Sequence, residues 1–403
     1  MKRRQFLHGS LSTLATSGIA ALPLAGAKAA PADAAAVVPS ARLDSERVLA
    51  PILASPDRII QMNVCTRPFR ERGPRLETET LQRKTLVHNY GHGGSGWSLS
   101  WGSGAQAVAR AREAGRNELA VVGCGAIGMT TALLAQRAGM AVTIYTKELP
   151  PYVRSSYATG GWTPDSRICT AAHAETFGPQ WEQMARYSYR HFQTLLGLPG
   201  HPVEWRDMYT LRDEPFGSDQ EDHGEDLEPE YPDFTRELIP DITPQSVDLT
   251  YDKHPFPTPH VRRRPMMLFN ISSYSRLLLS DFIRNGGNIE IVEMAGRDDF
   301  TQLDERTIIN CTGYGARALL DDDSIIPVRG QTAKLIPQPE VTYGFNYGDR
   351  RVSVYPRRDG LLVQAQAEGD FGNDAENLDP EESISAVNRL AGIMSEMQAR
   401  QRV

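Results

Sequence analysis

The stretch from Leu119 to Gly128, LAVVGCGAIG, joins a short apolar run to a glycine-rich turn. The apolar residues 119–122 predict a buried strand, and residues 127–138 predict the helix that follows the turn. A second apolar run, 141–145, predicts another strand after Gly139. A strand, a glycine turn, a helix and a strand in this order predict the βαβ start of a Rossmann-like sheet, and therefore an α/β fold.

The glycines of this turn have the G-x-G-x-x-G spacing that is typical of dinucleotide-binding sites. Gly123 allows a tight turn, Gly125 lets the backbone approach a pyrophosphate, and Gly128 lets the helix pack close to the sheet. Backbone N–H groups at the helix start, around Ala126 and Ile127, would bind the phosphates, because the helix dipole favours anions there. The alternative is a structural glycine turn in another kind of βα unit.

The residues after the second strand leave the ribose contact undecided. An acidic residue usually closes this strand and binds the ribose hydroxyls. Glu148 lies 20 residues after Gly128, which is slightly late, and Lys147 is nearer to the strand. Both are therefore candidate cofactor-binding residues.

The composition excludes several classes of protein. The 403 residues carry 43 Lys and Arg against 50 Asp and Glu, a net charge of −7, which argues against a nucleic-acid-binding surface. Hydrophobic residues make up 40% of the chain, enough for a large core. Four cysteines are too few for a disulfide-stapled scaffold, and they give neither a CxxC pair nor a zinc ligand set, so no metal site is expected. No uninterrupted apolar run is long enough to span a membrane.

The first thirty residues have the layout of a signal peptide. Basic residues at 2–4 precede an apolar run from Leu11 to about Leu24, and small residues that suit cleavage follow. The pair Arg3-Arg4, followed closely by Phe-Leu, resembles the bacterial twin-arginine export signal, which implies a periplasmic or secreted protein exported in the folded state. The alternatives are an N-terminal membrane anchor or a chance basic start.

The rest of the chain predicts both strands and helices. Four prolines make residues 254–265 extended, and the acidic stretch 213–240 indicates a solvated loop. Further elements follow from apolar periodicity and turn residues. These are helices at 43–56, 105–114, 272–285 and 380–400, and strands at 59–64, 289–293 and 307–310.

Four segments resemble the D-amino-acid oxidase family of glycine-oxidase-like flavoproteins. Residues 120–151 resemble its first Rossmann unit, and Arg154–Trp162, RSSYATGGW, resembles its next flavin-contacting loop. Residues 308–315, IINCTGYG, with the Arg-Gly-Gln at 329–331, resemble a later turn beside the flavin. The most specific match is Val87–Gly102, VHNYGHGGSGWSLSWG, which resembles the family signature, a glycine-rich loop whose N–H groups face the flavin.

The order of these segments is unusual for the family. The signature normally lies near the C-terminus, yet here it precedes the glycine turn, and the stretch 58–77 that comes before it resembles the family's segment just upstream of the signature. We therefore expect a circular permutation, which a fold tolerates when its termini lie close together. The expected organisation is a signal peptide (1–30), a spacer with a short helix (31–57), a permuted segment completing both domains (58–115), an FAD-binding Rossmann unit (116–170), a substrate domain with surface loops (171–270), the second part of the FAD domain (271–330) and the second part of a mixed-sheet substrate domain (331–403).

The resemblance implies FAD as the cofactor and assigns it a set of contacts. Besides the glycine turn and the two candidates for the ribose, they lie in the signature and in the two other flavin-contacting turns. The implied contacts are Gly93, Gly94, Ser95, Gly96, Trp97, Ser98, Ser155, Ser156, Gly160, Gly161, Trp162, Thr312 and Gly313. N–H groups of the signature would stabilise the reduced, anionic flavin, much as an oxyanion hole does.

The same resemblance implies that the enzyme oxidises D-amino acids to 2-oxo acids with ammonia and hydrogen peroxide. Arg67 matches the family's carboxylate-binding arginine, since a guanidinium gives a bidentate, charge-assisted fork. Tyr355 matches a substrate-contacting tyrosine. The position of the family's second, lid tyrosine holds Arg351, and Tyr347 is a candidate to replace it.

Several readings remain open for the activity. Molecular oxygen is the expected acceptor, but a glycine or amine dehydrogenase of the same fold would pass electrons elsewhere. A flavin-binding protein without turnover is a third possibility. An NAD-dependent dehydrogenase fits the glycine turn alone but leaves Val87–Gly102 unexplained.

Overall fold

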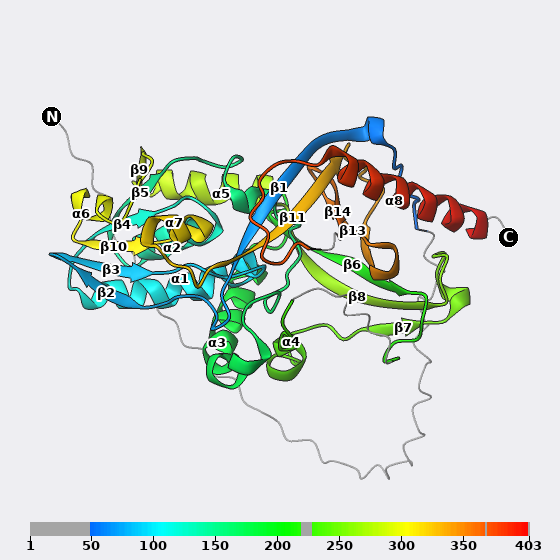
Figure 1. Cartoon of the computed structure of the whole chain (residues 1–403), viewed down its shortest axis with the longest axis horizontal. Coiled ribbons are helices and arrows are strands. Elements are labelled where there is room, and N and C mark those ends of the chain that lie inside the picture. The colour runs from blue at the N-terminus through cyan, green and yellow to red at the C-terminus, as the bar shows by residue number, and fades with distance from the viewer. Residues whose placement is uncertain (1–48, 219–227, 367–368, 402–403) are drawn as a thin grey trace, which may run out of the picture. The chain divides into compact units, whose positions relative to one another are not determined.

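The computed structural model describes residues 49–218, 228–366 and 369–401. Within them, two sheets carry the fold (Figure 1). The six-stranded sheet has the order β2 (Thr78–Leu81), β3 (Lys84–His88), β10 (Thr307–Asn310), β4 (Glu118–Val122), β5 (Ala141–Thr146) and β9 (Asn288–Ile291). Only β2 runs antiparallel to its neighbour in this sheet. The Rossmann-like prediction is confirmed, with α2 (Ala126–Arg137) connecting β4 to β5.

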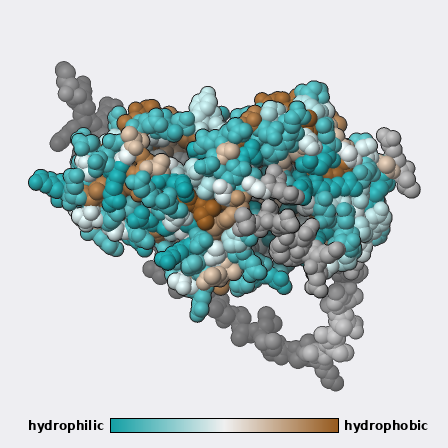
Figure 2. Space-filling model, viewed as in Figure 1, coloured by the Kyte–Doolittle hydropathy of each residue, from teal (hydrophilic) through white to brown (hydrophobic). Residues whose placement is uncertain are grey.

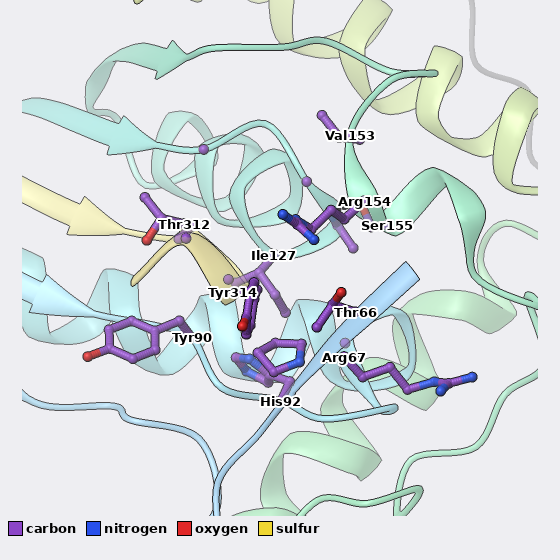
Figure 3. A pocket seen from close by; sticks show the side chains of 18 of the residues that line it. Thr66, Arg67, Tyr90, His92, Ile127, Val153, Arg154, Ser155, Thr312 and Tyr314 are labelled. Atoms are coloured by element: carbon purple, nitrogen blue, oxygen red, sulfur yellow. Dashed lines mark hydrogen bonds between the residues drawn. The ribbon is translucent and has the colours of Figure 1, made fainter. Parts of the chain in front are cut away.

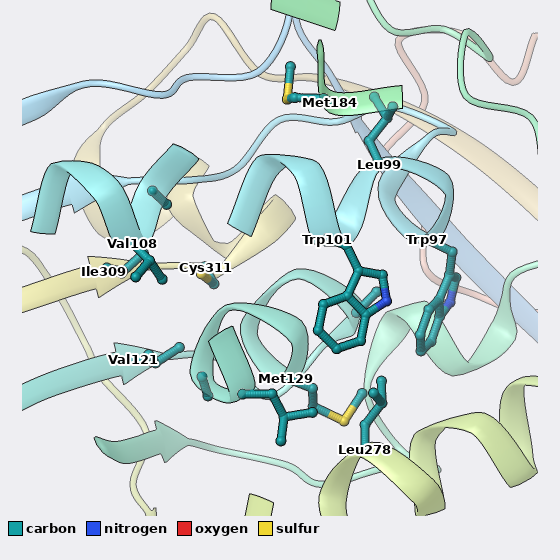
Figure 4. Close-up of a cluster of buried hydrophobic side chains, with 14 of the residues drawn as sticks. Trp97, Leu99, Trp101, Val108, Val121, Met129, Met184, Leu278, Ile309 and Cys311 are labelled. Carbon is teal, nitrogen blue, oxygen red and sulfur yellow. The ribbon is translucent and has the colours of Figure 1, made fainter. Parts of the chain in front are cut away.

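Helices pack against this sheet around an apolar core. α1 (Gly96–Glu113) contacts α2 and α3 (Ala174–Gln193), and α2 contacts α5 (Ile271–Arg284). Figure 4 shows Trp97 and Trp101 of α1 above Met129 of α2 and Leu278 of α5. Trp101 is buried, and its Nε1 donates to the Tyr274 hydroxyl at 2.7 Å. The short helices α6 (Asp299–Gln302) and α7 (Ala316–Leu320) flank β10 in the sequence.

The second sheet has eight strands and is mixed, as the resemblance implies. Its order is β1 (Ile59–Phe69), β11 (Ile326–Leu335), β14 (Gly360–Ala365), β13 (Val352–Arg357), β12 (Tyr343–Tyr347), β6 (Val203–Arg212), β8 (His260–Phe269) and β7 (Val247–Leu249). Only β12 and β6 pair in parallel. Side chains alternate across it, so Val352 and Val354 join the core beneath α8 (Pro380–Gln401), whereas Tyr355 lies on the other side. A short helix, α4 (Phe234–Leu238), lies in the stretch expected to be a solvated loop.

The N-terminal segment contributes to both sheets. β1 pairs with β11 along its length, and β3 pairs in parallel with β10. The helix expected at 43–56 is wrong for its described part, since 49–55 is irregular and only a 3-10 turn follows at Pro56–Arg58. Two prolines in this stretch disfavour a helix, and Ile52 is buried with its N–H donated to Met394 of α8.

One face of the molecule has a mostly hydrophilic surface, with hydrophobic residues in separate patches (Figure 2). Among the described residues, no helix has both the length and the apolar character needed to cross a membrane.

Candidate active site

The glycine turn between β4 and α2 is held in one conformation by its neighbours. Gly123 has a φ of +105°, and a Cβ there would lie 2.6 Å from the Cys311 carbonyl oxygen. A Cβ on Gly128 would lie 1.9 Å from the Gly123 oxygen, so both glycines are required. Gly125 faces open space apart from Ser155, whose Oγ accepts the Ala126 N–H at 3.1 Å. The Ala126 N–H, expected to bind a phosphate, is therefore already used by the protein, whereas Ile127, the next residue in the first turn of α2, lines the cavity and fits a pyrophosphate there.

The signature loop between β3 and α1 is equally constrained. Gly93 has a φ of +52°, and a Cβ there would lie 1.8 Å from the Arg167 carbonyl oxygen. The Gly93 N–H donates to the Pro68 oxygen at 2.8 Å, and the Gly94 N–H donates to the Ser166 oxygen at 3.0 Å. These N–H groups, expected to face the flavin, are therefore already used by the protein. Gly96 and Trp97, in the first turn of α1, offer N–H groups to the cavity instead.

One cavity of about 530 Å³ is lined by both glycine segments and by the edge of the second sheet. Figure 3 shows Ile127 of α2, Arg154 after β5, Tyr314 after β10 and Thr66 of β1 around it. The expected site residues that line it are Arg67, Gly93, Gly94, Gly96, Trp97, Gly123, Gly125, Ala126, Ile127, Lys147, Glu148, Ser155, Thr312, Gly313 and Tyr355. Segments more than two hundred residues apart in sequence thus meet at one site.

The remaining residues that were expected to contact the cofactor do not line the cavity. Ser95, Ser98 and Gly161 instead contact residues that do line it. Ser95 Oγ donates to the Ser166 oxygen at 2.9 Å, and Ser98 Oγ accepts the Thr163 N–H at 2.9 Å. Gly161 lies against the Tyr355 ring, since a Cβ there would be 3.1 Å from a ring carbon. The residues expected to contact the cofactor but outside the lining are Ser95, Ser98, Gly128, Ser156, Gly160, Gly161 and Trp162.

Tyr347 lies away from the cavity, in the core between β12 and α8. It is fully buried, and its hydroxyl donates to the Asp213 carboxylate. The structure therefore does not bring Tyr347 to the site, and Arg351 at the lid position forms a left-handed turn after a 3-10 segment.

Arg67 and Tyr355 lie at the sheet end of the cavity. The Arg67 guanidinium packs on Gly330, where a Cβ would be 2.5 Å from Nη2, and Nη1 donates to the Arg329 oxygen at 2.8 Å. No carboxylate of the described residues lies within ion-pair distance of it. Burial, with the nearby Arg167, lowers the pKa of Arg67, and the negative charge of Asp370 partly opposes this effect. Burial raises the pKa of Tyr355, so its hydroxyl stays protonated and can donate a hydrogen bond.

Other cavity residues were not expected from the sequence. Arg167 forms a two-point ion pair with Glu228, whose carboxylate also accepts the Tyr231 hydroxyl at 2.9 Å. Arg154 forms an ion pair with Glu376, and both side chains are largely exposed at the surface. Arg154 begins the loop Arg154–Trp162 that resembles the family, whereas no motif marks Arg167, Glu228 or Tyr231.

At the dinucleotide end, Lys147 and Glu148 follow β5 directly. Lys147 Nζ lies 3.7 Å from Glu293, and both side chains are exposed. The Glu148 backbone oxygen accepts Thr146 Oγ1 at 2.8 Å, which fixes the chain at the end of the strand. Both residues line the cavity, and so does Glu293. The carboxylates of Glu148 and Glu293 are therefore both candidates to bind a ribose.

His92, Cys124 and Cys311 of the site are buried and uncharged. Burial lowers the pKa of His92 to about 3 and raises the pKa of Cys124 and Cys311 to about 12. His92 Nε2 lies 2.7 Å from Ser103 Oγ, whose proton goes to the Asn89 oxygen, so Nε2 is the donor. In the described part of the chain, no group of three or more metal-ligating side chains is assembled.

A two-sheet fold with a dinucleotide turn and a glycine-rich loop around one cavity defines a flavoprotein oxidoreductase. The profile of the FAD dependent oxidoreductase family, DAO, matches residues 118–401, and the chain belongs to this family. FAD is its cofactor. Residues 59–113 lie outside the matched range, although they supply β1, β3 and α1.

Three known proteins illustrate the similarity. The D-amino-acid oxidase of Dictyostelium discoideum is 25% identical over 277 residues, 68% of this chain and 72% of the relative. The D-amino-acid oxidase of Streptomyces coelicolor is 27% identical over 284 residues, 70% of this chain and 78% of the relative. Among solved structures, glycine oxidase from Geobacillus kaustophilus superposes with a TM-score of 0.50 and 14% identity, covering 70% of this chain and 80% of that one.

Proposed function

We propose that this FAD-dependent oxidoreductase oxidises D-amino acids to 2-oxo acids and passes the electrons to oxygen. The observation that carries the proposal is Arg67, a half-buried guanidinium in the flavin cavity that has no carboxylate partner among the described residues. Asp370 acts on Arg67 without forming a direct ion pair, so a carboxylate in contact with the guanidinium has to come from a ligand, and an anionic substrate group supplies one. The relatives named D-amino-acid oxidase support this choice of substrate.

The overall reaction balances with water and oxygen as co-reactants. When bound, FAD would accept the hydride that leaves the substrate α-carbon. The α C–H and N–H bonds are exchanged for a C=N bond, and water then releases ammonia and leaves the 2-oxo acid. Oxygen takes the two electrons and becomes hydrogen peroxide.

The chain's own groups bind and orient the substrate. Arg67 would hold the carboxylate through two N–H donors, which fixes direction as well as affinity. The Tyr355 hydroxyl, beside it in the cavity, would donate a further hydrogen bond. The positive end of α1, at Gly96 and Trp97, would favour negative charge on the reduced cofactor.

The test is product analysis with purified holoenzyme and a panel of D- and L-amino acids, glycine and simple amines. We expect hydrogen peroxide, ammonia and 2-oxo acid in equal amounts from D-amino acids. Flavin reduction without peroxide would favour a dehydrogenase that uses another acceptor. No flavin reduction by any substrate would favour a protein without turnover.

We also propose that the chain is a circular permutant of its family. In support, Gln401 at the end of α8 donates its side-chain N–H to the Leu49 oxygen at 3.1 Å, so the two ends of the described chain are adjacent. The exposed loop 114–117 would be the new connection. A gene that begins at Asn117, joins Gln401 to Leu49 and ends at Arg116 should yield a yellow, folded protein, whereas opening the chain within β4 should not.

Export is a further proposal, and it concerns residues 1–30, outside the described part of the chain. Replacing Arg3 and Arg4 with lysine should leave uncleaved precursor in the cytoplasm of a bacterial host that has the twin-arginine route. Normal export of this variant would remove the twin-arginine assignment.

A further inference from the structure

A second, smaller cavity of about 170 Å³ adjoins the substrate end of the flavin cavity. Thr163 lines both cavities. Gly161 connects them structurally: a Cβ there would be 3.1 Å from the Tyr355 ring and 3.0 Å from Met266 Sδ, and Met266 lines the smaller cavity. Whatever binds at Tyr355 therefore lies next to this second space.

Two residues that line the smaller cavity, Trp162 and Arg264, have donor groups without a partner of the expected kind. Trp162 is 4% exposed, and its buried Nε1 has no acceptor. Arg264 on β8 also lines the cavity, and no carboxylate of the described residues lies within ion-pair distance of it. An arginine that lines a cavity and has no carboxylate beside it favours an anionic ligand in that cavity.

The acidic residues of the smaller cavity are already engaged. Asp165 accepts the Thr235 N–H at 2.9 Å, and Asp233 accepts the Arg236 N–H at 3.1 Å. Both carboxylates thus hold the start of α4. They leave Arg264 without a partner.

The arginines around the two cavities divide into two kinds. Arg154 is paired with Glu376, and Arg167 is paired with Glu228. Arg67 and Arg264 have no such partner. Burial raises the pKa of the Tyr355 hydroxyl, and the positive charges of Arg67, Arg167 and Arg264 oppose this shift.

We propose that the enzyme acts on D-amino acids with a carboxylate side chain, D-aspartate or D-glutamate, and that Arg264 binds that carboxylate in the smaller cavity. Arg67 takes the α-carboxylate, so two unpaired guanidinium groups meet the two carboxylates of one substrate. The inference rests on the proposed D-amino-acid oxidation and narrows its substrate class.

The test compares each acid with its amide, since D-aspartate and D-asparagine have nearly the same size. For the wild-type holoenzyme, kcat/KM should be at least tenfold higher for D-aspartate than for D-asparagine, or for D-glutamate than for D-glutamine. Arg264→Met should lower this acid-to-amide ratio at least tenfold. Arg262→Met is the matched control, because Arg262 lies two residues away on β8 and is paired with Asp248 on the surface.

Binding gives a second readout without turnover. Malonate, a dicarboxylate, should bind the wild-type holoenzyme more tightly than acetate, as measured by flavin absorbance changes, and Arg264→Met should remove most of the difference. Amides oxidised as well as acids, or an equal loss for both in Arg264→Met, would overturn the inference. If neutral D-amino acids alone reduce the flavin, only this inference fails; if no D-amino acid does, the proposed function fails as well.

Discussion

Replacing Arg67 with methionine should raise the KM for the D-amino acid substrate about 10- to 150-fold. In the structure the guanidinium makes one hydrogen bond to the protein, from Nη1 to the Arg329 oxygen, and its other N–H groups are left for a ligand. Removing a charged hydrogen-bond partner costs about 1.5–3 kcal/mol, which corresponds to that range of KM. FAD content should be retained, because we expect the phosphates at the start of α2 and not at Arg67.

Two further variants separate charge from geometry. Arg67→Lys keeps the charge but loses the planar fork, so we expect a KM between those of the wild type and Arg67→Met. Gly330→Ala keeps the arginine but places a Cβ 2.5 Å from Nη2, which forces the fork to move and should also raise KM. Arg72→Met, at an exposed arginine near the end of β1, is the control.

The assay is steady-state peroxide formation, normalised to bound flavin, over a range of substrate concentrations. A KM for Arg67→Met within twofold of the wild-type value, with FAD bound, would refute the role of Arg67. Loss of FAD instead of a raised KM would move Arg67 from the substrate to the cofactor.

Three other predictions concern the substrate tyrosine, the signature loop and acid stability. Tyr355→Phe should raise KM about 2- to 12-fold, the effect of one neutral hydrogen bond, and an unchanged KM would exclude that bond. Gly93→Ala should weaken FAD binding in fluorescence titrations, because its Cβ would meet the Arg167 oxygen at 1.8 Å, whereas Gly392→Ala in open space on α8 should bind FAD normally. Burial lowers the pKa of His92 from 6.5 to about 3. Between these two pH values the native state binds fewer protons than the unfolded state, so the free energy of unfolding falls as the pH falls. His92→Gln should flatten the pH dependence of the unfolding free energy between pH 6 and 4 by about 1.4 kcal/mol per unit, and an equal slope in urea unfolding would contradict this.

The sequence predicted the Rossmann unit well because its signals are local. Apolar runs, glycine spacing and helix periodicity around residues 118–146 each depend on near neighbours, and β4, α2 and β5 lie within one or two residues of the expected bounds. The joining of this unit with Val87–Gly102 came from family resemblance, since nothing local connects two segments that meet only in the folded chain.

The start of α1 was missed because its glycines read as a loop. The helix begins at Gly96, although a helix was expected only from 105. Gly102 is there for packing, since a Cβ would lie 2.2 Å from the Met184 oxygen of α3. Intrinsic propensity counts glycine as helix-breaking, whereas close contact between helices makes it necessary here. This earlier start also moves the free N–H groups from the loop to the helix terminus.

Tyr347 and the arginines show two other limits. Counting back from Tyr355 put Arg351 at the lid position and left Tyr347 as a possible replacement, but Tyr347 lies on β12 among side chains that pack beneath α8. Arg167 and Arg264 lie in a region with neither motif nor clear resemblance. Their importance depends on which carboxylates lie beside them, and only the folded arrangement provides that information.

The most direct measurement of the central claim is anaerobic mixing of the purified flavoprotein with single amino-acid enantiomers, followed by flavin absorbance. The account predicts rapid loss of the oxidised flavin band with D-amino acids, none with their L-enantiomers, and much slower loss for Arg67→Met at the same substrate concentration. Reduction by L- and D-enantiomers alike, or rates independent of Arg67, would contradict it.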